Sequence, residues 1–167
     1  MHYPFYLSIH FRNSDTFEDA KGATGIRGDL QAFNENLPAA ESQSLSGAAL
    51  AKPIFKRGDG YAYLKDTSDG EGFAPAEYCC EMQLYTPRKG AKPMRVLRIL
   101  AVPVVNASGK VRYSDSFMIH AAKMPSQLKG CVAPDGWDLE ELWAALGGWK
   151  VGKQFPLTVF GGRKDWL

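Results

Sequence analysis

The sequence is short of the features that would place the chain across a membrane or on a disulfide framework. No run of apolar residues approaches the ~18 that a membrane-spanning helix needs. Only three cysteines occur, and an odd number that includes the adjacent pair Cys79 and Cys80 is a poor basis for disulfides. We therefore expect no membrane span and thiols that stay reduced while the chain folds.

An excess of charge of one sign is also missing. The chain has 20 Lys and Arg against 18 Asp and Glu, a net charge of +2. The densest basic segment, residues 86–98, is best explained as a solvated turn and strand edge, with a surface for an anionic polymer as the alternative. We expect no nucleic-acid partner.

The first residues, MHYPFYLSIHFRNSD, carry no basic segment, no long apolar stretch and no small-residue cleavage site. These are the parts of a secretory signal. We expect synthesis in the cytoplasm without a signal peptide, so that any action elsewhere needs another route of delivery.

The pattern along the 167 residues predicts a single domain over 1–167 that is mainly β, a β-rich α+β fold. It predicts a small sheet or barrel-like sandwich with one helix following a turn at Cys131. Residues 12–53, rich in small and polar residues, are expected to form an irregular arm or lid with one or two short helices. The expected strands and hairpin lie at 3–11, 53–73, 77–87, 94–105, 111–120 and 155–161, and the expected helix at 135–149.

Chemistry concentrates in residues 116–136, SFMIHAAKMPSQLKGCVAPDG. His120 ends an expected strand, and Cys131 follows Gly130 in an expected turn. A thiol becomes a strong nucleophile as thiolate, and a histidine within reach supplies the base. Backbone N–H groups at a tight turn can hold a developing oxyanion.

Two plainer interpretations compete with catalysis. A buried histidine and an inert thiol can lie close in a chain by chance. A metal site is the other, but no C-x-x-C or H-x-x-H pair is present. We expect neither a metal nor a cofactor.

The order of these features resembles the catalytic core of the L,D-transpeptidase (YkuD-like) family. The matching parts are Ile119-His120, Gly130-Cys131-Val132, the helix 138–146 and the turn at Val151-Gly152 that leads into a strand. The resemblance spans residues 94–161, the expected catalytic core, and suggests a divergent phage-type or secreted-effector-type member.

The chain also departs from the family pattern. Ala121 stands where a glycine usually follows the histidine, and Leu128 stands where the motif has a serine. Ala133 replaces an arginine that is thought to help bind substrate.

The resemblance implies a cysteine enzyme acting on peptidoglycan stem peptides, as an L,D-transpeptidase, an L,D-carboxypeptidase or a D-amino-acid exchange enzyme. Cys131 would be the nucleophile, His120 the base, and the amides of Gly130 and Cys131 the oxyanion hole. Ser126 and Trp137 are the expected substrate-binding residues. Ser126 or a backbone carbonyl in the loop 121–128 would orient His120.

The resemblance further suggests action in the periplasm or cell wall after non-classical delivery, with a small immunity protein as partner if the chain is a secreted toxin. The alternative is a non-catalytic phage structural or host-interaction module that keeps the fold. An enzyme requires the sulfur within ~3–4 Å of an imidazole nitrogen and a groove that reaches the pair. A sulfur buried under aromatic side chains would favour the module.

Overall fold

Alternating apolar and polar residues build most of the protein as β-strands. The computed structural model describes residues 4–18, 20–21, 24–35, 45–51, 55–56, 62–65, 76–105, 111–122 and 131–161. In β1 (Phe5–Glu18), Leu7 and Ile9 are buried whereas His10 and Arg12 are exposed. Side chains of a strand point to opposite faces in turn, so one face of β1 lies in the core. The protein is mainly β, as expected.

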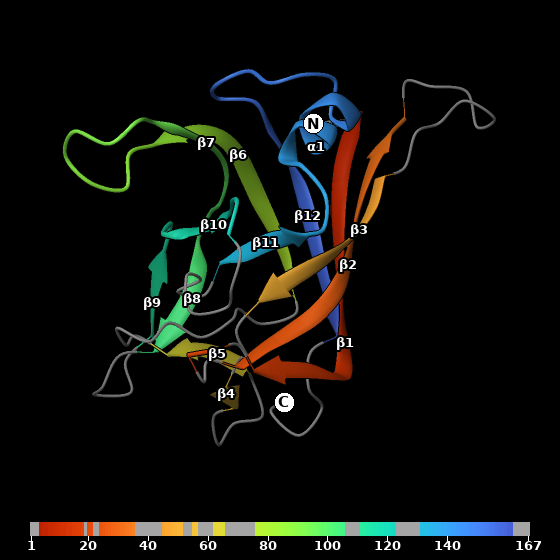
Figure 1. The fold of residues 1–167 in the computed structure, drawn as a ribbon, viewed down its shortest axis with the longest axis vertical. Coiled ribbons are helices and arrows are strands. Elements are labelled where there is room, and N and C mark those ends of the chain that lie inside the picture. Colours follow the sequence, from red (N-terminus) through yellow and green to blue (C-terminus); the bar gives the residue numbers. More distant parts are fainter. Residues whose placement is uncertain are drawn as a thin grey trace.

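Eight strands form a closed barrel in the described part of the chain (Figure 1). Neighbouring strands are antiparallel except for two parallel pairs, β1 with β12 and β10 with β11. The order around the barrel is β1, β12 (Gln154–Gly161), β6 (Glu77–Tyr85), β7 (Met94–Ile99), β10 (Phe117–Ile119), β11 (Val132–Asp135), β3 (Leu45–Ala51) and β2 (Thr24–Asn34).

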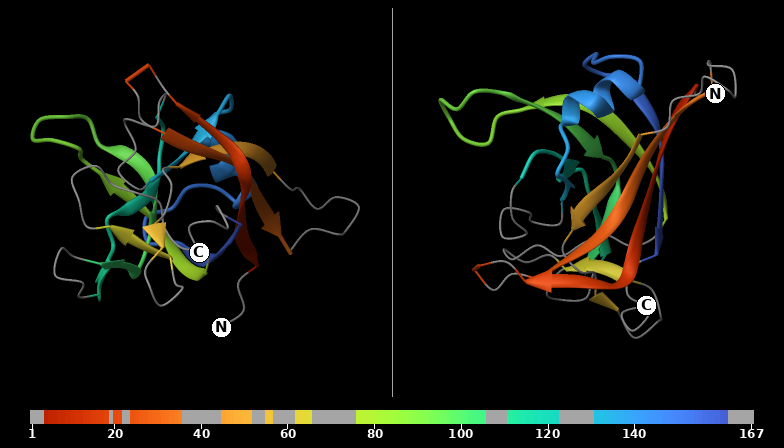
Figure 2. Two further views of the ribbon diagram at one scale, coloured as in Figure 1. Left: turned by 90° about the horizontal axis from the view of Figure 1, so that it is seen from below. Right: turned by 45° about the vertical axis from the view of Figure 1, so that its right-hand side comes forward.

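A second sheet contains four short strands in the order β4 (Phe55–Lys56), β5 (Ala62–Lys65), β8 (Val102–Val105) and β9 (Val111–Ser114). It lies toward the opposite end of the barrel from the helix (Figures 1 and 2). Phe55 pairs with Tyr63, so the hairpin expected over 53–73 is confirmed.

The long strands expected at 94–105 and 111–120 are each broken in two. The chain leaves the barrel at Ala101, whose φ is 54°, and the backbone N–H of Ala101 donates to the Asp115 carboxylate at 2.7 Å. That bond stabilises a backbone conformation that residues other than glycine seldom adopt. Asp115 also lies at the second break, so one side chain holds both bends.

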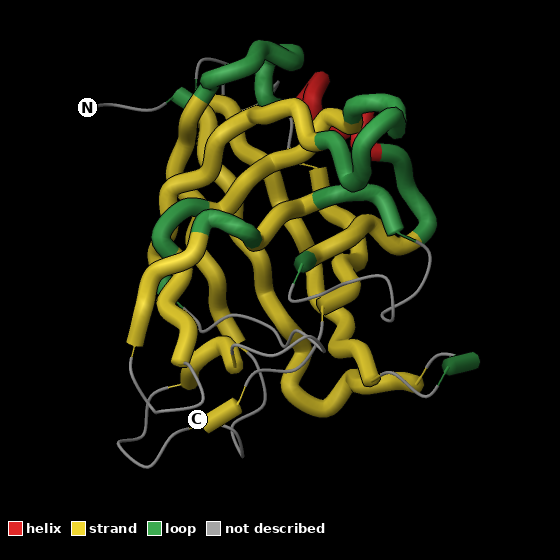
Figure 3. The backbone as a smooth tube through the Cα atoms, turned by 90° about the vertical axis from the view of Figure 1, so that its left-hand side faces the viewer, coloured by secondary structure: helices red, strands yellow, loops and turns green. Residues whose placement is uncertain are grey.

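The helix α1 (Leu139–Ala145) lies at one end of the barrel (Figure 3). The Asp138 side chain caps it by accepting from the backbone N–H of Glu140 at 3.0 Å, a role that aspartate commonly has at the start of a helix. At its other end the Lys153 ammonium donates to the carbonyl of Leu146 at 2.6 Å. The Lys153 contact ties the end of the helix to the start of β12.

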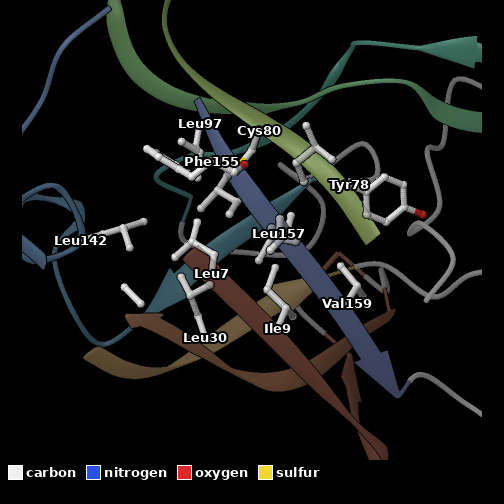
Figure 4. Packing of buried hydrophobic residues seen from close by; sticks show 14 of the residues in the cluster. Leu7, Ile9, Leu30, Tyr78, Cys80, Leu97, Leu142, Phe155, Leu157 and Val159 are labelled. Atoms are coloured by element: carbon white, nitrogen blue, oxygen red, sulfur yellow. The ribbon is translucent and has the colours of Figure 1, made fainter. Parts of the chain in front are cut away.

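The core fills the inside of the barrel and the space under α1. Cys80, Phe155 and Leu157 point inward from neighbouring strands, and Leu142 reaches them from the helix (Figure 4). This main core cluster holds the inward residues of β1, β2, β6, β7, β10, β11 and β12. The helix therefore closes one end of the barrel with apolar side chains.

The prediction for residues 12–53 is wrong in its described part. Instead of an irregular arm with short helices, β1 continues to Glu18, and β2 and β3 are barrel strands. Gly28 lies inside β2, although glycine in a sequence usually indicates a break in a strand. Here a Cβ on Gly28 would clash with the backbone oxygen of His10, so the glycine permits close approach of β1 and β2.

We predict that Leu142→Ala lowers the free energy of unfolding by about 2–5 kcal/mol, because it leaves a cavity in the helix–barrel contact. Leu84→Ala is the matched control. Leu142 is 0% exposed and Leu84 is 55% exposed, so the control should change stability by only ~0.5 kcal/mol. Urea denaturation measures both, and equal losses would show that α1 is not part of the cooperative core.

Candidate functional site

Parallel pairing of β10 and β11 places His120 and Cys131 at the ends of neighbouring strands. Ile119, the last residue of β10, pairs with Val132, the first residue of β11. The backbone N–H of His120 donates to the carbonyl of Val132 at 3.0 Å. The end of β10 thus lies beside the start of β11. His120 directly follows Ile119, and Cys131 directly precedes Val132.

His120 and Cys131 occupy the outer face of the barrel. Ile119 and Val132 point into the main core cluster, and side chains alternate along a strand. Cys131 accordingly packs outside the barrel with Val96, Met118 and Ala133, a group that we call the outer cluster. Continued register makes His120 and Cys131 diagonal neighbours, offset by two residues, with ~8 Å between their Cα atoms.

The His120 ring is oriented by the next residue of the chain. Its Nδ1 lies 2.9 Å from the carbonyl oxygen of Ala121. A carbonyl only accepts hydrogen bonds, so Nδ1 carries the proton and Nε2 of the neutral ring has the free lone pair. The orienting group is thus a backbone carbonyl in the loop 121–128, one of the two candidates that the sequence offers.

Burial sets the protonation of the same ring. Desolvation lowers the pKa of His120, and the hydrogen bond to Ala121 partly opposes this by raising it. An imidazole with a lowered pKa is neutral at physiological pH and is able to accept a proton. Orientation and protonation both suit a general base.

The Cys131 side chain is only 4% exposed. It forms no disulfide. Four partly exposed residues pack against the outer cluster: Phe17, Tyr85, Met94 and Ala122. A molecule that reacts with the sulfur must displace part of this cover.

The helix expected soon after Cys131 is present: its N-cap, Asp138, lies seven residues after Cys131. The strand β11, which was not expected from the sequence, fills the space between Cys131 and α1. Cys131 directly precedes that barrel strand, and the strand fixes its position against β10. Gly130 and Ser126, the other expected site residues in this segment, lie outside the described residues.

Trp137 is placed apart from Cys131. It is partly buried and packs against the main core cluster, not against the outer cluster. A cavity of about 550 Å³ lies nearby in the chain, among residues 147–153, and neither His120 nor Cys131 lines it. Within the described residues, the contacts of Trp137 therefore give no support to a groove that joins it to the nucleophile.

Two residues of the N-terminal strands reach the site unexpectedly. Phe17 packs against the outer cluster, and the guanidinium carbon of Arg27 lies 4.1 Å from the centre of the Phe17 ring. The signal for their placement was the alternation in residues 24–34, where Ile26, Leu30 and Ala32 are buried. A strand there turns Arg27 outward, onto the face that carries Cys131.

Comparison with known proteins finds no family model, curated protein or solved structure that matches the chain. No helix in the described ranges is long and apolar enough to cross a membrane. Among the residues described, no three His, Cys, Asp or Glu side chains gather as metal ligands. A functional assignment therefore depends on the geometry around Cys131 and on the sequence resemblance.

We predict that His120 titrates below the ordinary histidine pKa of ~6.5, because burial disfavours the imidazolium. NMR of the histidine ring signals, assigned with His120→Gln, measures the midpoint. Between the lowered pKa and ~6.5 the unfolded chain binds more protons than the native protein, so stability should fall as the pH drops through that window. A His120 midpoint at or above 6.5 would contradict this.

Proposed function

We propose that the protein is a cysteine-dependent acyl transferase or peptidase acting on peptidoglycan stem peptides. The observation that carries the proposal is the β10–β11 register, which puts Cys131 and an oriented, neutral His120 on one face as diagonal neighbours. The order of motifs over residues 94–161 supports an L,D-transpeptidase-like reaction and supplies the substrate class.

In the first step, Nε2 of His120 takes the proton of the Cys131 thiol. The thiolate attacks the carbonyl carbon of the third stem residue, a diaminopimelate-type centre. The carbonyl becomes a tetrahedral oxyanion, held by backbone N–H groups at Gly130 and Cys131. Return of its electron pair breaks the C–N bond, and the imidazolium gives its proton to the departing D-alanine amine.

In the second step, an acceptor resolves the thioester. An amine of another stem gives a cross-link, a free D-amino acid gives exchange, and water gives carboxypeptidase cleavage. In each case His120 removes a proton from the attacking group, and the Cys131 sulfur leaves. The proton then returns to the thiolate, which restores the starting site.

The place of action belongs to the same proposal. The substrate class lies in the periplasm or cell wall, which the protein would reach by phage lysis or a secretion machine. If it is delivered as an antibacterial effector, a small immunity protein that covers the Cys131 face would protect the producing cell.

A second candidate is a non-catalytic module that keeps this fold for host interaction or phage structure. Burial of Cys131 in an apolar cluster against which Phe17 and Tyr85 pack favours it, because a covered thiol packs as a small apolar side chain. The two candidates differ in one property, which is whether the sulfur forms a covalent bond with a stem peptide.

We predict that the wild-type protein forms a thioester with a tetrapeptide stem and releases D-alanine. Intact-protein mass spectrometry detects the adduct, and peptide mapping locates it at Cys131. Cys131→Ala should abolish the adduct, and His120→Gln should slow its formation by about 10²–10⁴-fold, the usual contribution of a general base.

Cys79→Ser is the matched control. Cys79 is a partly exposed thiol on β6, and its removal should leave acylation unchanged. Absence of an adduct with tetrapeptide and pentapeptide stems, in protein that unfolds cooperatively, would reject the enzyme and favour the module.

A further inference from the structure

The charged residues beside the outer cluster differ in how completely they are paired. Arg12 contacts Asp15 at 2.9 Å and Asp29 at 2.8 Å. Arg27 donates one hydrogen bond to Asp15, at 3.2 Å, and its Nε lies 3.9 Å from the Asp135 carboxylate. That second distance is too long for a hydrogen bond. Arg27 and Asp135 thus form a long ion pair without a direct hydrogen bond.

Both members of this pair are accessible, with side chains 37% and 44% exposed. The guanidinium carbon lies 4.1 Å from the centre of the Phe17 ring, a cation–π contact that helps to hold the side chain in place. Among the described residues Asp15 alone accepts a hydrogen bond from Arg27, so further N–H groups remain for a ligand. A planar guanidinium binds a carboxylate with two parallel hydrogen bonds.

We propose that Arg27 and Asp135 bind a zwitterionic α-amino-acid head group, with its carboxylate on Arg27 and its ammonium on Asp135. A zwitterion replaces the long Arg27–Asp135 contact with two bonded contacts and adds no net charge. A ligand that is only anionic would compete with Asp135 for Arg27. A ligand that is only cationic would leave Arg27 unmatched. The pair therefore selects for both charges on one small group.

The position of the pair relative to Cys131 suggests where such a group comes from. Asp135 lies four residues beyond Cys131 on the same face of β11, ~13 Å along the strand. Ala133 lies between them and also belongs to the outer cluster. Ala133 of β11 pairs with Leu50 of β3, and Leu50 pairs in turn with Arg27 of β2. Arg27 therefore projects from two strands away toward this path.

A diaminopimelate residue acylated on Cys131 has the matching shape. Five carbon–carbon bonds join its reacting carbonyl to the far α-carbon and extend ~6 Å. With the C–S bond, the far C–N bond and a hydrogen bond of ~3 Å added, the extended residue reaches ~12 Å from the sulfur, close to the ~13 Å between Cys131 and Asp135 along the strand. Its far end carries an ammonium and a carboxylate, whereas a lysine side chain carries an ammonium alone.

The path over Ala133 is covered by the outer cluster's partly exposed neighbours, among them Phe17. Phe17 pairs with Gly25 of β2, and the β2 side chain over the ring is that of Arg27. An aliphatic chain that slides beside the ring would exchange one apolar contact for another. Ala133 is fully buried, so the aliphatic chain must displace part of this cover, and the small Ala133 side chain obstructs it less than a long side chain would.

This inference rests on the proposed function for its donor, and a free D-amino acid acting as acceptor offers the same chemistry. The test measures acylation of the full-length protein by tetrapeptide stems whose third residue is diaminopimelate, diaminopimelate amidated at its far carboxylate, or lysine. Wild type should acylate fastest with diaminopimelate. Arg27→Gln and Asp135→Asn should each reduce that preference by about 10–100-fold, the usual loss of a charge-assisted hydrogen bond.

Arg95→Gln is the matched control. Arg95 is also 3.6 Å from a carboxylate, that of Glu140 on α1, and also lies over an aromatic ring, that of Trp149. Neither of these partners belongs to the outer cluster. Loss of the Arg95 guanidinium should leave the donor preference unchanged. Circular dichroism and thermal unfolding test whether each variant is folded.

Calorimetry with Cys131→Ala separates this inference from the proposed reaction. Binding of the diaminopimelate stem, but not the lysine stem, that depends on Arg27 supports the head-group site even if wild type forms no thioester. Binding of free D-alanine with the same dependence, while the stems show none, assigns the site to the acceptor. Acylation at equal rates with all three stems, unchanged by Arg27→Gln, overturns the head-group site and leaves the reaction intact. Loss of both acylation and Arg27-dependent binding overturns both.

Discussion

The site depends on one structural constraint, the parallel pairing of β10 with β11. Parallel neighbours cannot be joined by a tight turn, so the chain must cross over between them. Here the crossover begins after His120 and ends at Cys131. The hydrogen bond from His120 N–H to the Val132 carbonyl fixes both ends. His120 and Cys131, which are separated along the chain, thereby come to lie on neighbouring strands of one barrel wall, as the proposed base and nucleophile.

The strands and the helix with strong local patterns could be predicted from the sequence. The Asp138 cap and the buried face of Leu139, Leu142 and Trp143 identify α1 without tertiary information. Closure of the barrel could not be predicted, because it needs β2 and β3 to join β1 to β11 through non-local hydrogen bonds. Gly28 indicated a break in the pattern, yet its missing Cβ is what allows β1 and β2 to approach.

The residues of the candidate site also divide into those that the sequence indicates and those that only the fold brings there. His120 and Cys131 could be found because they flank one loop, so local order suffices. Phe17 and Arg27 come from the other end of the chain and reach the outer cluster only because β3 connects β2 to β11. The small size of Ala133 bears on the site only when Ala133 is considered together with Phe17 and Arg27. Where the family resemblance expects an arginine on β11, this chain has a small residue, and an arginine from β2 projects toward the same face.

Burial of the site bears on how a reaction would start. A buried ion pair is costly unless it is fully hydrogen-bonded, and desolvation lowers the pKa of His120. The resting imidazole is therefore neutral, with its free lone pair on Nε2 because Nδ1 donates to Ala121. Such a site does not store a thiolate–imidazolium pair. In the proposed reaction, it would transfer the proton when a polar substrate displaces the cover over Cys131, so the start of the chemistry would depend on binding.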